Sequence, residues 1–178
     1  VSGLIKSGDG TLSLTADNAY AGNTVIQQGT LAISREGSLG VGTTVTINNG
    51  TVLQTNKDVI ISKGVILDSQ STIDTDGNNS KVTGNISGAG QLVKFGDGSL
   101  TLDTKVTALD GTVSYKGNDY DGGTLINGGL LIVNDNKDLG KANTNVAITG
   151  GTLQIANDIT LERNIVTSTT AGGSISTA

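Results

Sequence analysis

The residues of this chain that could perform acid–base chemistry are aspartates in close pairs. Asp119 and Asp121 flank Tyr120, and Asp74 and Asp76 form a second pair. Two carboxylates can act as acid and base in the hydrolysis of a glycosidic bond. The chain has no His and no Cys, so a serine nucleophile would lack a histidine partner and only Asp or Glu could serve as a base near neutral pH. We interpret both pairs as solvated turn residues.

A β-helical polysaccharide lyase or hydrolase is the alternative that these carboxylates leave open. Such an enzyme would hold its carboxylates or arginines together on adjacent coils. The two arginines, Arg35 and Arg163, lie far apart in the sequence and do not indicate a cluster. We therefore predict that the chain is not an enzyme and has no catalytic residues.

A Gly-Asp-Gly triplet occurs twice, with Asp9 and Asp97 at its centre. One interpretation is a turn that binds calcium or another ligand. The other is a tight turn in which Asp caps nearby backbone amides. The Gly-Gly-x-Gly-x-Asp nonapeptide pattern and the EF-hand spacing are both missing from the sequence. The sequence thus predicts structural turns, with no metal and no cofactor.

Two further residue types recur beside these turns. Tyr20 and Tyr120 could stack on sugars, but their repetition favours packing over a corner of the fold. Lys6 and Lys94 each precede a Gly-Asp-Gly turn, and the default interpretation for such a lysine is a solvated face.

These residues must be positioned by short strands, because polar and apolar residues alternate in many brief runs. Examples are Thr11–Leu14, Thr44–Ile47 and Ser99–Leu102, and alternation of this kind places Leu and Ile on one face. No stretch of ten residues or more has helical periodicity. The residues predicted to point inward are Leu12, Leu14, Val59, Ile61, Val65, Leu67, Ile73, Val82, Ile86, Leu100, Leu102, Val113, Leu131, Val133, Val146, Ile148, Leu153, Ile155, Ile159, Leu161 and Ile165.

The chain contains roughly two copies of one long unit. The segment Gly8–Leu14 (GDGTLSL) returns as Gly96–Leu102 (GDGSLTL), a shift of 88 residues, and Tyr20–Ile33 resembles Tyr120–Val133 at a shift of 100. Extra residues between Leu102 and Tyr120 account for the difference and should lengthen one coil. We predict one continuous domain over residues 1–178, with internal units of approximately 3–90 and 91–178.

Two architectures fit these strands and turns. An antiparallel sandwich would use hairpins, and Asn49-Gly50 between two short runs is typical of one. A parallel β-helix would wind each coil onto the previous one at a spacing of about 4.8 Å. The long repeat favours the β-helix, because a solenoid repeats its sequence and a sandwich has no reason to. At about 20 residues a coil, the chain would make roughly nine coils over about 40 Å.

Composition excludes several classes of protein. The 178 residues include 27 Gly and no Pro, and the net charge is −5. The basic residues are scattered, which argues against nucleic acid as a partner. No window resembles a membrane-spanning helix or a signal sequence, so we expect no direct membrane insertion and targeting segments outside this fragment. The absence of Cys suits a protein that crosses a membrane unfolded.

The repeated blocks resemble the autotransporter-associated β-strand repeat found in the passenger regions of Gram-negative autotransporters. That motif runs Lys-x-Gly-x-Gly-Thr-Leu-x-Leu, then Asn-x-Tyr-x-Gly-x-Thr, then Gly-Thr-Leu. Asn18 and Asn118 fit it, and Leu130 departs from it where the first copy has Thr30. The remaining matching residues are Lys6, Gly8, Asp9, Gly10, Leu12, Leu14, Tyr20, Gly22, Thr24, Gly29 and Leu31 in the first copy, and Lys94, Gly96, Asp97, Gly98, Leu100, Leu102, Tyr120, Gly122, Thr124, Gly129 and Leu131 in the second.

This resemblance implies an all-β, right-handed parallel β-helix, a single-stranded solenoid that is exported to the cell surface. Its implied partner is the protein's own C-terminal outer-membrane β-barrel, beyond this fragment; a host surface or like passengers are further candidates. The expected role is a structural stalk that promotes passenger folding and secretion, within an adhesin or self-associating factor. Neither end shows an evident cap, so we also expect fraying around Thr169–Ala178 and end-to-end stacking.

Overall fold

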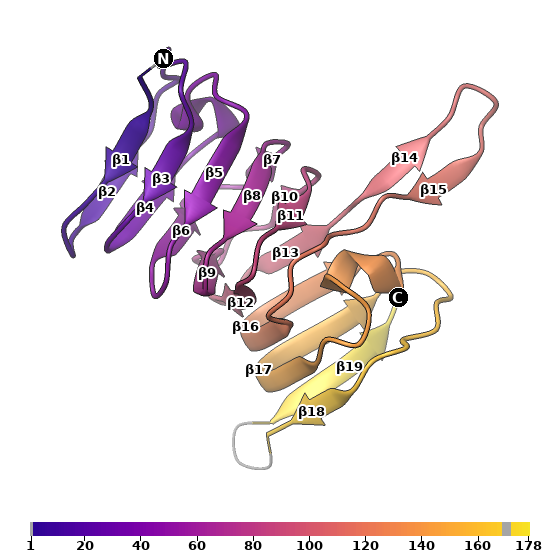
Figure 1. The fold of residues 1–178 in the computed structure, drawn as a ribbon. Helices are drawn as coiled ribbons and strands as arrows, with labels where there is room; N and C mark the ends of the chain where they lie inside the picture. Colours follow the sequence, from indigo (N-terminus) through magenta and orange to yellow (C-terminus); the bar gives the residue numbers. More distant parts are fainter. Residues whose placement is uncertain (1, 169–171) are drawn as a thin grey trace.

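The computed structural model describes residues 2–168 and 172–178 and shows an all-β solenoid of parallel strands (Figure 1). The prediction of a parallel β-helix is confirmed, and the sandwich is wrong. Asn49-Gly50 lies at a corner between two strands that each pair in parallel with neighbouring coils, and the Thr51 N–H donates to the Asn48 carbonyl there.

Three faces surround the core, which we name A, B and C. Each contains strands stacked from successive coils. Face A consists of β1 (Leu4–Lys6), β3 (Thr24–Ile26), β5 (Thr44–Ile47), β8 (Gly64–Leu67) and β11 (Ile86–Ser87).

Face B is the longest of the three and joins the two halves of the chain. Eight described segments stack on it in order: β2 (Thr11–Leu14), β4 (Thr30–Ile33), β6 (Val52–Thr55), β9 (Gln70–Asp74), β12 (Gln91–Phe95), the first parts of β16 (Thr124–Val133) and β17 (Val146–Ile155), and β18 (Ile165–Thr167). The solenoid therefore has about eight coils, where the sequence predicts roughly nine.

Face C begins later along the chain. It contains β7 (Ile60–Ile61), β10 (Ser80–Val82), β13 (Ser99–Leu102), the second parts of β16 and β17, and β19 (Gly173–Thr177). In the first coils the corresponding side is occupied by loops and by the short 3₁₀ helix η1 (Glu36–Leu39), whereas a second such helix, η2 (Asn136–Leu139), follows β16. No helix among the described residues is long and apolar enough to cross a membrane.

The core consists of columns of aliphatic side chains, one from each coil. Leu31, Leu53 and Ile73 are in register on face B, and all three are fully buried. Leu100 and Leu102 are also fully buried, as predicted, while Leu12 and Leu14 are partly buried against the same cluster. Burial of one such side chain contributes about 1.5–3 kcal/mol, so this continuous column dominates the stability of the solenoid.

The extra residues of the second copy do not simply lengthen a coil. They form an antiparallel hairpin of β14 (Lys105–Thr107) and β15 (Val113–Tyr115), which projects from the solenoid (Figure 1). Val113 was predicted to point inward, and this prediction is wrong because the side chain is 47% exposed on the hairpin. The period-2 alternation indicates a strand but does not distinguish a strand of the core from one of a projecting arm.

The sequence repeat is longer than a whole number of coils. Parallel register connects Leu4 through Thr24, Val45 and Val65 to Ile86, so four coils span 82 residues, whereas the motif returns after 88. The second copy therefore begins one face further around the axis. Strand β1 of the first copy lies on face A, and its sequence counterpart β12 lies on face B.

The expectation of fraying around Thr169–Ala178 remains a prediction. Residues 169–171 lie outside the described residues, and β19 pairs in parallel with β17.

Candidate functional site

Lys94 occupies a position in the hydrophobic core. In register it lies between Ile73 of the preceding coil and Ile126 of the following one, and its side chain is fully buried. Its four methylene groups thus replace an aliphatic side chain in the face B column. The prediction that this lysine is solvated is wrong.

The buried ammonium of Lys94 is satisfied by backbone carbonyls at the corner of the coil. Nζ donates to the carbonyl oxygens of Phe95 at 2.9 Å, Gly96 at 2.7 Å and Gly128 at 3.2 Å. An ammonium group has three donors, so all of them are used. Burial lowers the pKa of Lys94 to about 8, and the charges of Asp74 and Asp97 partly oppose this shift.

Lys6 repeats the arrangement in the first copy. It is in register with Ile26 and is 6% exposed, and its Nζ donates to the carbonyl oxygens of Ser7, Gly8 and Gln28 at 3.2, 2.5 and 2.9 Å. Both lysines therefore bind two carbonyls of their own turn and one carbonyl of the next coil. The solvated interpretation is wrong for Lys6 as well.

The Gly-Asp-Gly turns are shaped by glycine and closed by lysine rather than by aspartate. Gly8 and Gly96 have φ angles of 78° and 82°, a left-handed conformation that glycine adopts without steric cost. Among the described residues, the carboxylates of Asp9 and Asp97 accept no hydrogen bond. The expected capping of local amides by aspartate is therefore wrong.

The two tyrosines pack over a different corner. The Tyr120 hydroxyl lies 2.6 Å from the Thr124 hydroxyl, and the Tyr20 hydroxyl lies 2.7 Å from the Thr24 hydroxyl. Each ring lies against a glycine of the next coil, because a Cβ on Gly40 or Gly140 would lie within 2.8 Å of the ring. Tyr120 is fully buried and burial raises its pKa. This geometry agrees with packing over a corner and leaves no ring face free on Tyr120 for a sugar.

The other motif residues are found where coils approach one another. Gly29 and Gly129 have positive φ, and Gly22 and Gly122 lie so close to the backbone of the preceding coil that a Cβ would come within 2.6 Å of it. Thr24 and Thr124 begin strands, Leu12, Leu14, Leu31, Leu100, Leu102 and Leu131 face the core, and Gly10 and Gly98 directly precede a strand.

The carboxylate pairs do not converge on a common centre. Asp119 accepts from the Asn85 side chain at 3.1 Å, and Asp121 forms an ion pair of 2.6 Å with Lys141. Asp74 accepts from the Asp76 N–H at 2.9 Å and from Gln54 at 2.9 Å. Neither pair therefore joins its two carboxylates at one centre. The interpretation as solvated turn residues is wrong for Asp74, which is half-buried at the end of strand β9.

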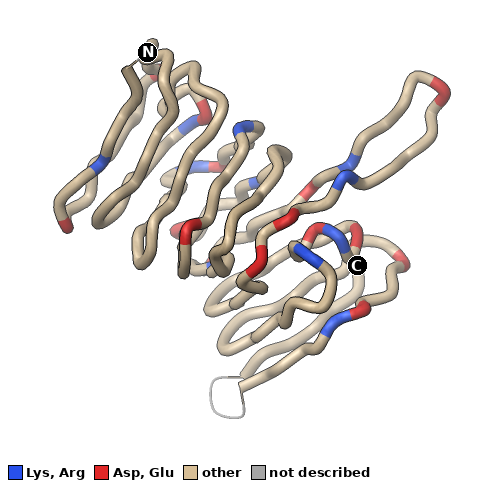
Figure 2. Tube along the Cα trace, in the orientation of Figure 1, with Lys and Arg blue, Asp and Glu red and all other residues tan. Residues whose placement is uncertain are grey.

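The two arginines are equally separate. Arg35 lies 3.8 Å from Asp17 in an exposed pair. Arg163 donates to the carbonyl oxygens of Asn136 at 2.7 Å and Leu139 at 2.9 Å, which closes the end of η2. Figure 2 shows Lys and Arg distributed along the whole solenoid rather than gathered on one face.

Sequence reasoning missed a buried carboxylate, Asp138. It accepts from the hydroxyl of Thr104 at 2.5 Å and from the N–H groups of Asn134 and Asp135 at 2.9 and 3.0 Å. Burial raises its pKa, and these hydrogen bonds partly oppose that effect. The available signal was the capping box, in which Asp135 and Asp138 each cap the other's backbone.

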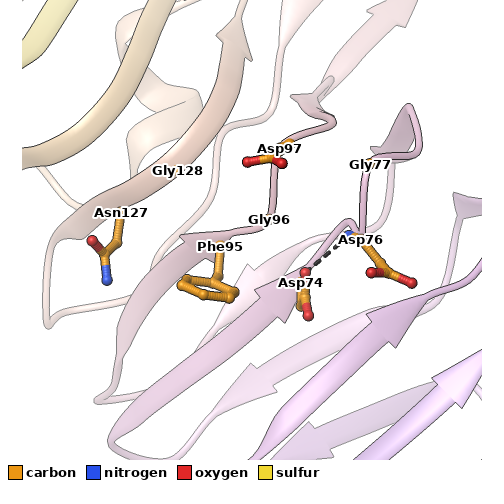
Figure 3. Close-up of a pocket in the computed structure, with 8 residues that line it drawn as sticks. All are labelled: Asp74, Asp76, Gly77, Phe95, Gly96, Asp97, Asn127 and Gly128. Atoms are coloured by element: carbon orange, nitrogen blue, oxygen red, sulfur yellow. Dashed lines mark hydrogen bonds between the residues drawn. The ribbon is translucent and has the colours of Figure 1, made fainter.

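A surface hollow of about 420 Å³ lies over the Lys94 corner (Figure 3). It is lined by Asp74, Asp76, Gly77, Phe95, Gly96, Asp97, Asn127 and Gly128. Within residues 2–168 and 172–178, no group of three His, Cys, Asp or Glu is placed to hold a metal ion.

Comparison with known proteins agrees with this geometry. The family model described as the passenger-associated transport repeat matches residues 4–33 and 92–133, which contain the two lysine corners. The chain is also 44% identical over 100 residues to the adhesin BmaC autotransporter of Brucella suis biovar 1 (strain 1330). That alignment covers 56% of this chain and 3% of the relative.

No solved structure matches the chain. Two segments of the chain, both within the parallel solenoid, match the passenger-associated transport repeat, and the chain is similar over part of its length to an adhesin autotransporter.

Proposed function

We propose that this chain is a non-enzymatic, structural part of an autotransporter passenger that promotes the folding and secretion of that passenger. The observation that carries the proposal is the repeated lysine corner. Lys6 and Lys94 each bind a carbonyl of the following coil. A coil that has just formed thus offers donors to the coil that forms next.

In this proposal the motif residues of both copies stabilise the stacking of one coil on the next. Lysine joins consecutive coils, glycine allows their close approach, tyrosine closes the second corner and leucine fills the core. A solenoid whose units contact only their neighbours can fold by propagation from one formed unit. Such directional growth suits a chain that emerges progressively through a membrane.

The proposed cellular location rests on the family match and on the similarity to the adhesin autotransporter. The parent protein is an adhesin or self-associating factor displayed on the surface of a Gram-negative bacterium and anchored by its own C-terminal β-barrel. The absence of enzymatic activity is supported by the separate engagement of Asp119, Asp121, Arg35 and Arg163.

The test is secretion of the full-length autotransporter with Lys94→Ala and, as matched control, Lys57→Ala, since Lys57 is exposed. Surface display is measured by antibody labelling of intact cells and by trypsin release. We expect Lys94→Ala to lower display several-fold and Lys57→Ala to leave it unchanged. Wild-type display of the Lys94→Ala protein, together with a reduced free energy of unfolding of the purified chain, would refute the role in secretion.

A further inference from the structure

The hollow over the Lys94 corner differs from the equivalent corner of the first copy in the residues that line it. By the two sequence shifts, Phe95 replaces Ser7, and Gly128 replaces Gln28. The Gln28 side chain lies over the Gly8 turn of the preceding coil, where its Oε1 accepts from the Gly8 N–H at 2.9 Å. Gly128 has no side chain, and the equivalent Gly96 N–H donates no hydrogen bond among the described residues. The Gly96 turn therefore lacks the covering side chain that Gln28 places over the Gly8 turn. A hollow of about 390 Å³ at the first corner is lined by the first coil alone, from Ile5 to Leu12, whereas the hollow at the second corner is lined by three coils.

An aromatic ring lies at this second corner. Phe95 is the only Phe of the chain and is 47% exposed. Figure 3 shows its ring between Asn127 on one side and Asp74 on the other, at the edge of the hollow. An exposed aromatic surface at the wall of a hollow can take the apolar face of a ligand.

The polar groups around the ring are of both kinds. The carboxylates of Asp76 and Asp97 accept no hydrogen bond among the described residues and can accept from hydroxyl groups. The Gly96 N–H donates to nothing described, and the Asn127 side-chain NH₂ likewise makes no described bond, whereas its Oδ1 accepts from Thr149 at 3.3 Å. The hollow thus offers two acceptors, two donors and one apolar surface.

The ligand that matches these acceptors, donors and aromatic surface carries hydroxyl groups on a ring that also has an apolar C–H face. Each hydroxyl can donate to a carboxylate and accept from an N–H, while its C–H face lies on Phe95. A cation would suit the carboxylates and the ring. However, it would meet both N–H groups and the Lys94 ammonium, which is bound to the carbonyls of Gly96 and Gly128 below them. We propose that the hollow formed by Phe95, Gly96, Asp97, Asp76, Asn127 and Gly128 is a binding site for a neutral saccharide.

This site goes beyond the proposed structural role, because neither Phe95 nor an uncovered Gly96 turn is needed to stack coils. The first copy has the same lysine corner without a Phe and with Gln28 bonded to its turn. A failure to bind saccharide would therefore not contradict the proposed role in secretion. Likewise, a failure of the secretion test would not contradict the proposed saccharide site.

The test is a titration of the ¹⁵N-labelled chain with neutral oligosaccharides, namely maltotriose, cellotriose, lactose and mannotriose, with amide shifts as the readout. We expect at least one of them to shift Gly96 and Gly98. Phe95→Ser restores the residue of the first copy, and Gly128→Gln restores its covering side chain. A Cβ at Gly128 meets nothing nearer than the Gly96 nitrogen at 3.4 Å, so the second variant can fold. Each variant should weaken binding by about tenfold or more.

The matched control is Gln28→Gly, which removes the cover from the first corner without supplying a Phe and should leave the Gly96 shifts unchanged. Circular dichroism establishes that each variant is folded. Three results would overturn the proposal: no oligosaccharide of the panel shifts Gly96, the shifts survive in both Phe95→Ser and Gly128→Gln, or spermidine shifts the same amides while the saccharides do not.

Discussion

The ammonium nitrogen of Lys94 donates a 3.2 Å hydrogen bond to the carbonyl oxygen of Gly128, 34 residues further along the chain. In the first copy Lys6 makes the same contact with Gln28 over only 22 residues. The hairpin β14–β15 accounts for most of the extra length. The bond from the lysine to a carbonyl of the next coil is therefore kept although a hairpin is inserted between the two residues that it joins.

Replacing Lys94 with Ala should destabilise the chain by about 2–5 kcal/mol, since it leaves a cavity in the face B column and removes the donor from three carbonyls. Lys57→Ala, at an exposed position, should change stability by less than about 0.5 kcal/mol. Urea denaturation followed by circular dichroism measures both. An equal effect of the two substitutions would mean that the buried stem of Lys94 does not contribute to the core.

The stability of the wild-type chain should rise between about pH 8 and pH 10, by about 2 kcal/mol. The pKa of Lys94 is about 8 in the folded chain against an ordinary value of 10.5. In this window the unfolded chain binds more protons than the folded one, so raising the pH favours folding. Above about pH 10 the raised pKa of Tyr120 acts in the opposite direction, because tyrosines of the unfolded chain ionise first.

Lys94→Met provides the reference for this pH dependence, because it keeps the stem and removes the titrating group. The free energy of unfolding is measured at several pH values for both proteins. If the variant shows the same rise as the wild type, Lys94 is not its source.

Leu100→Ala should cost about 2–5 kcal/mol through cavity formation, because Leu100 is fully buried. Thr101 is the next residue on the same strand and faces the other way, so Thr101→Ala should cost much less. Thermal or chemical unfolding compares the pair directly. A cost below about 0.5 kcal/mol for Leu100→Ala would contradict the assignment of the inward face.

Tyr120→Phe should destabilise by about 1–2 kcal/mol, because it leaves the buried Thr124 hydroxyl without its partner at 2.6 Å. Tyr20→Phe removes the equivalent bond to Thr24 where the tyrosine is only partly buried, so water can replace part of it and the cost should be smaller. Chemical denaturation ranks the two variants, and the reverse order would contradict the role given to burial.

Much of the fold could be predicted from the sequence, because period-2 alternation and a long repeat both indicate stacked strands. The lysines could not be placed by residue type alone. A signal did exist, since Lys6 and Lys94 each lie two residues after a Leu and so share its inward parity. The solvated interpretation is wrong because of this parity, and because the long stem of a lysine can lie in a core while its ammonium group binds carbonyls.

The hairpin and the hollow could not be predicted from the sequence for a different reason. Val113 alternates like a core residue, and only the register of neighbouring coils shows that no strand stacks on it. The hollow brings together Asp74, Phe95 and Asn127 from three successive coils, and their proximity depends on pairings such as Phe95 with Asp74. Residue types of this kind, dispersed over 50 positions, give no local signal.

The hairpin should be dispensable for stability. Its strands pair only with each other among the described residues, and the Lys116 N–H donates to the Thr104 carbonyl at 3.1 Å, so its two ends are already adjacent. Replacing residues 105–115 with a short Gly-Ser link should change the free energy of unfolding by less than about 1 kcal/mol. A large loss of cooperativity in urea denaturation would show instead that the arm supports the coils below it.

The mismatch between the 88-residue repeat and the 82 residues of four coils determines the direction in which each copy points. Each further unit of this length would advance its lysine corner by one of three faces, and the fourth unit would again point the way the first did. A rod assembled from such units would present its corners on all sides in rotation. A ligand-binding corner placed in that series could meet a surface whichever way the rod had turned about its own axis.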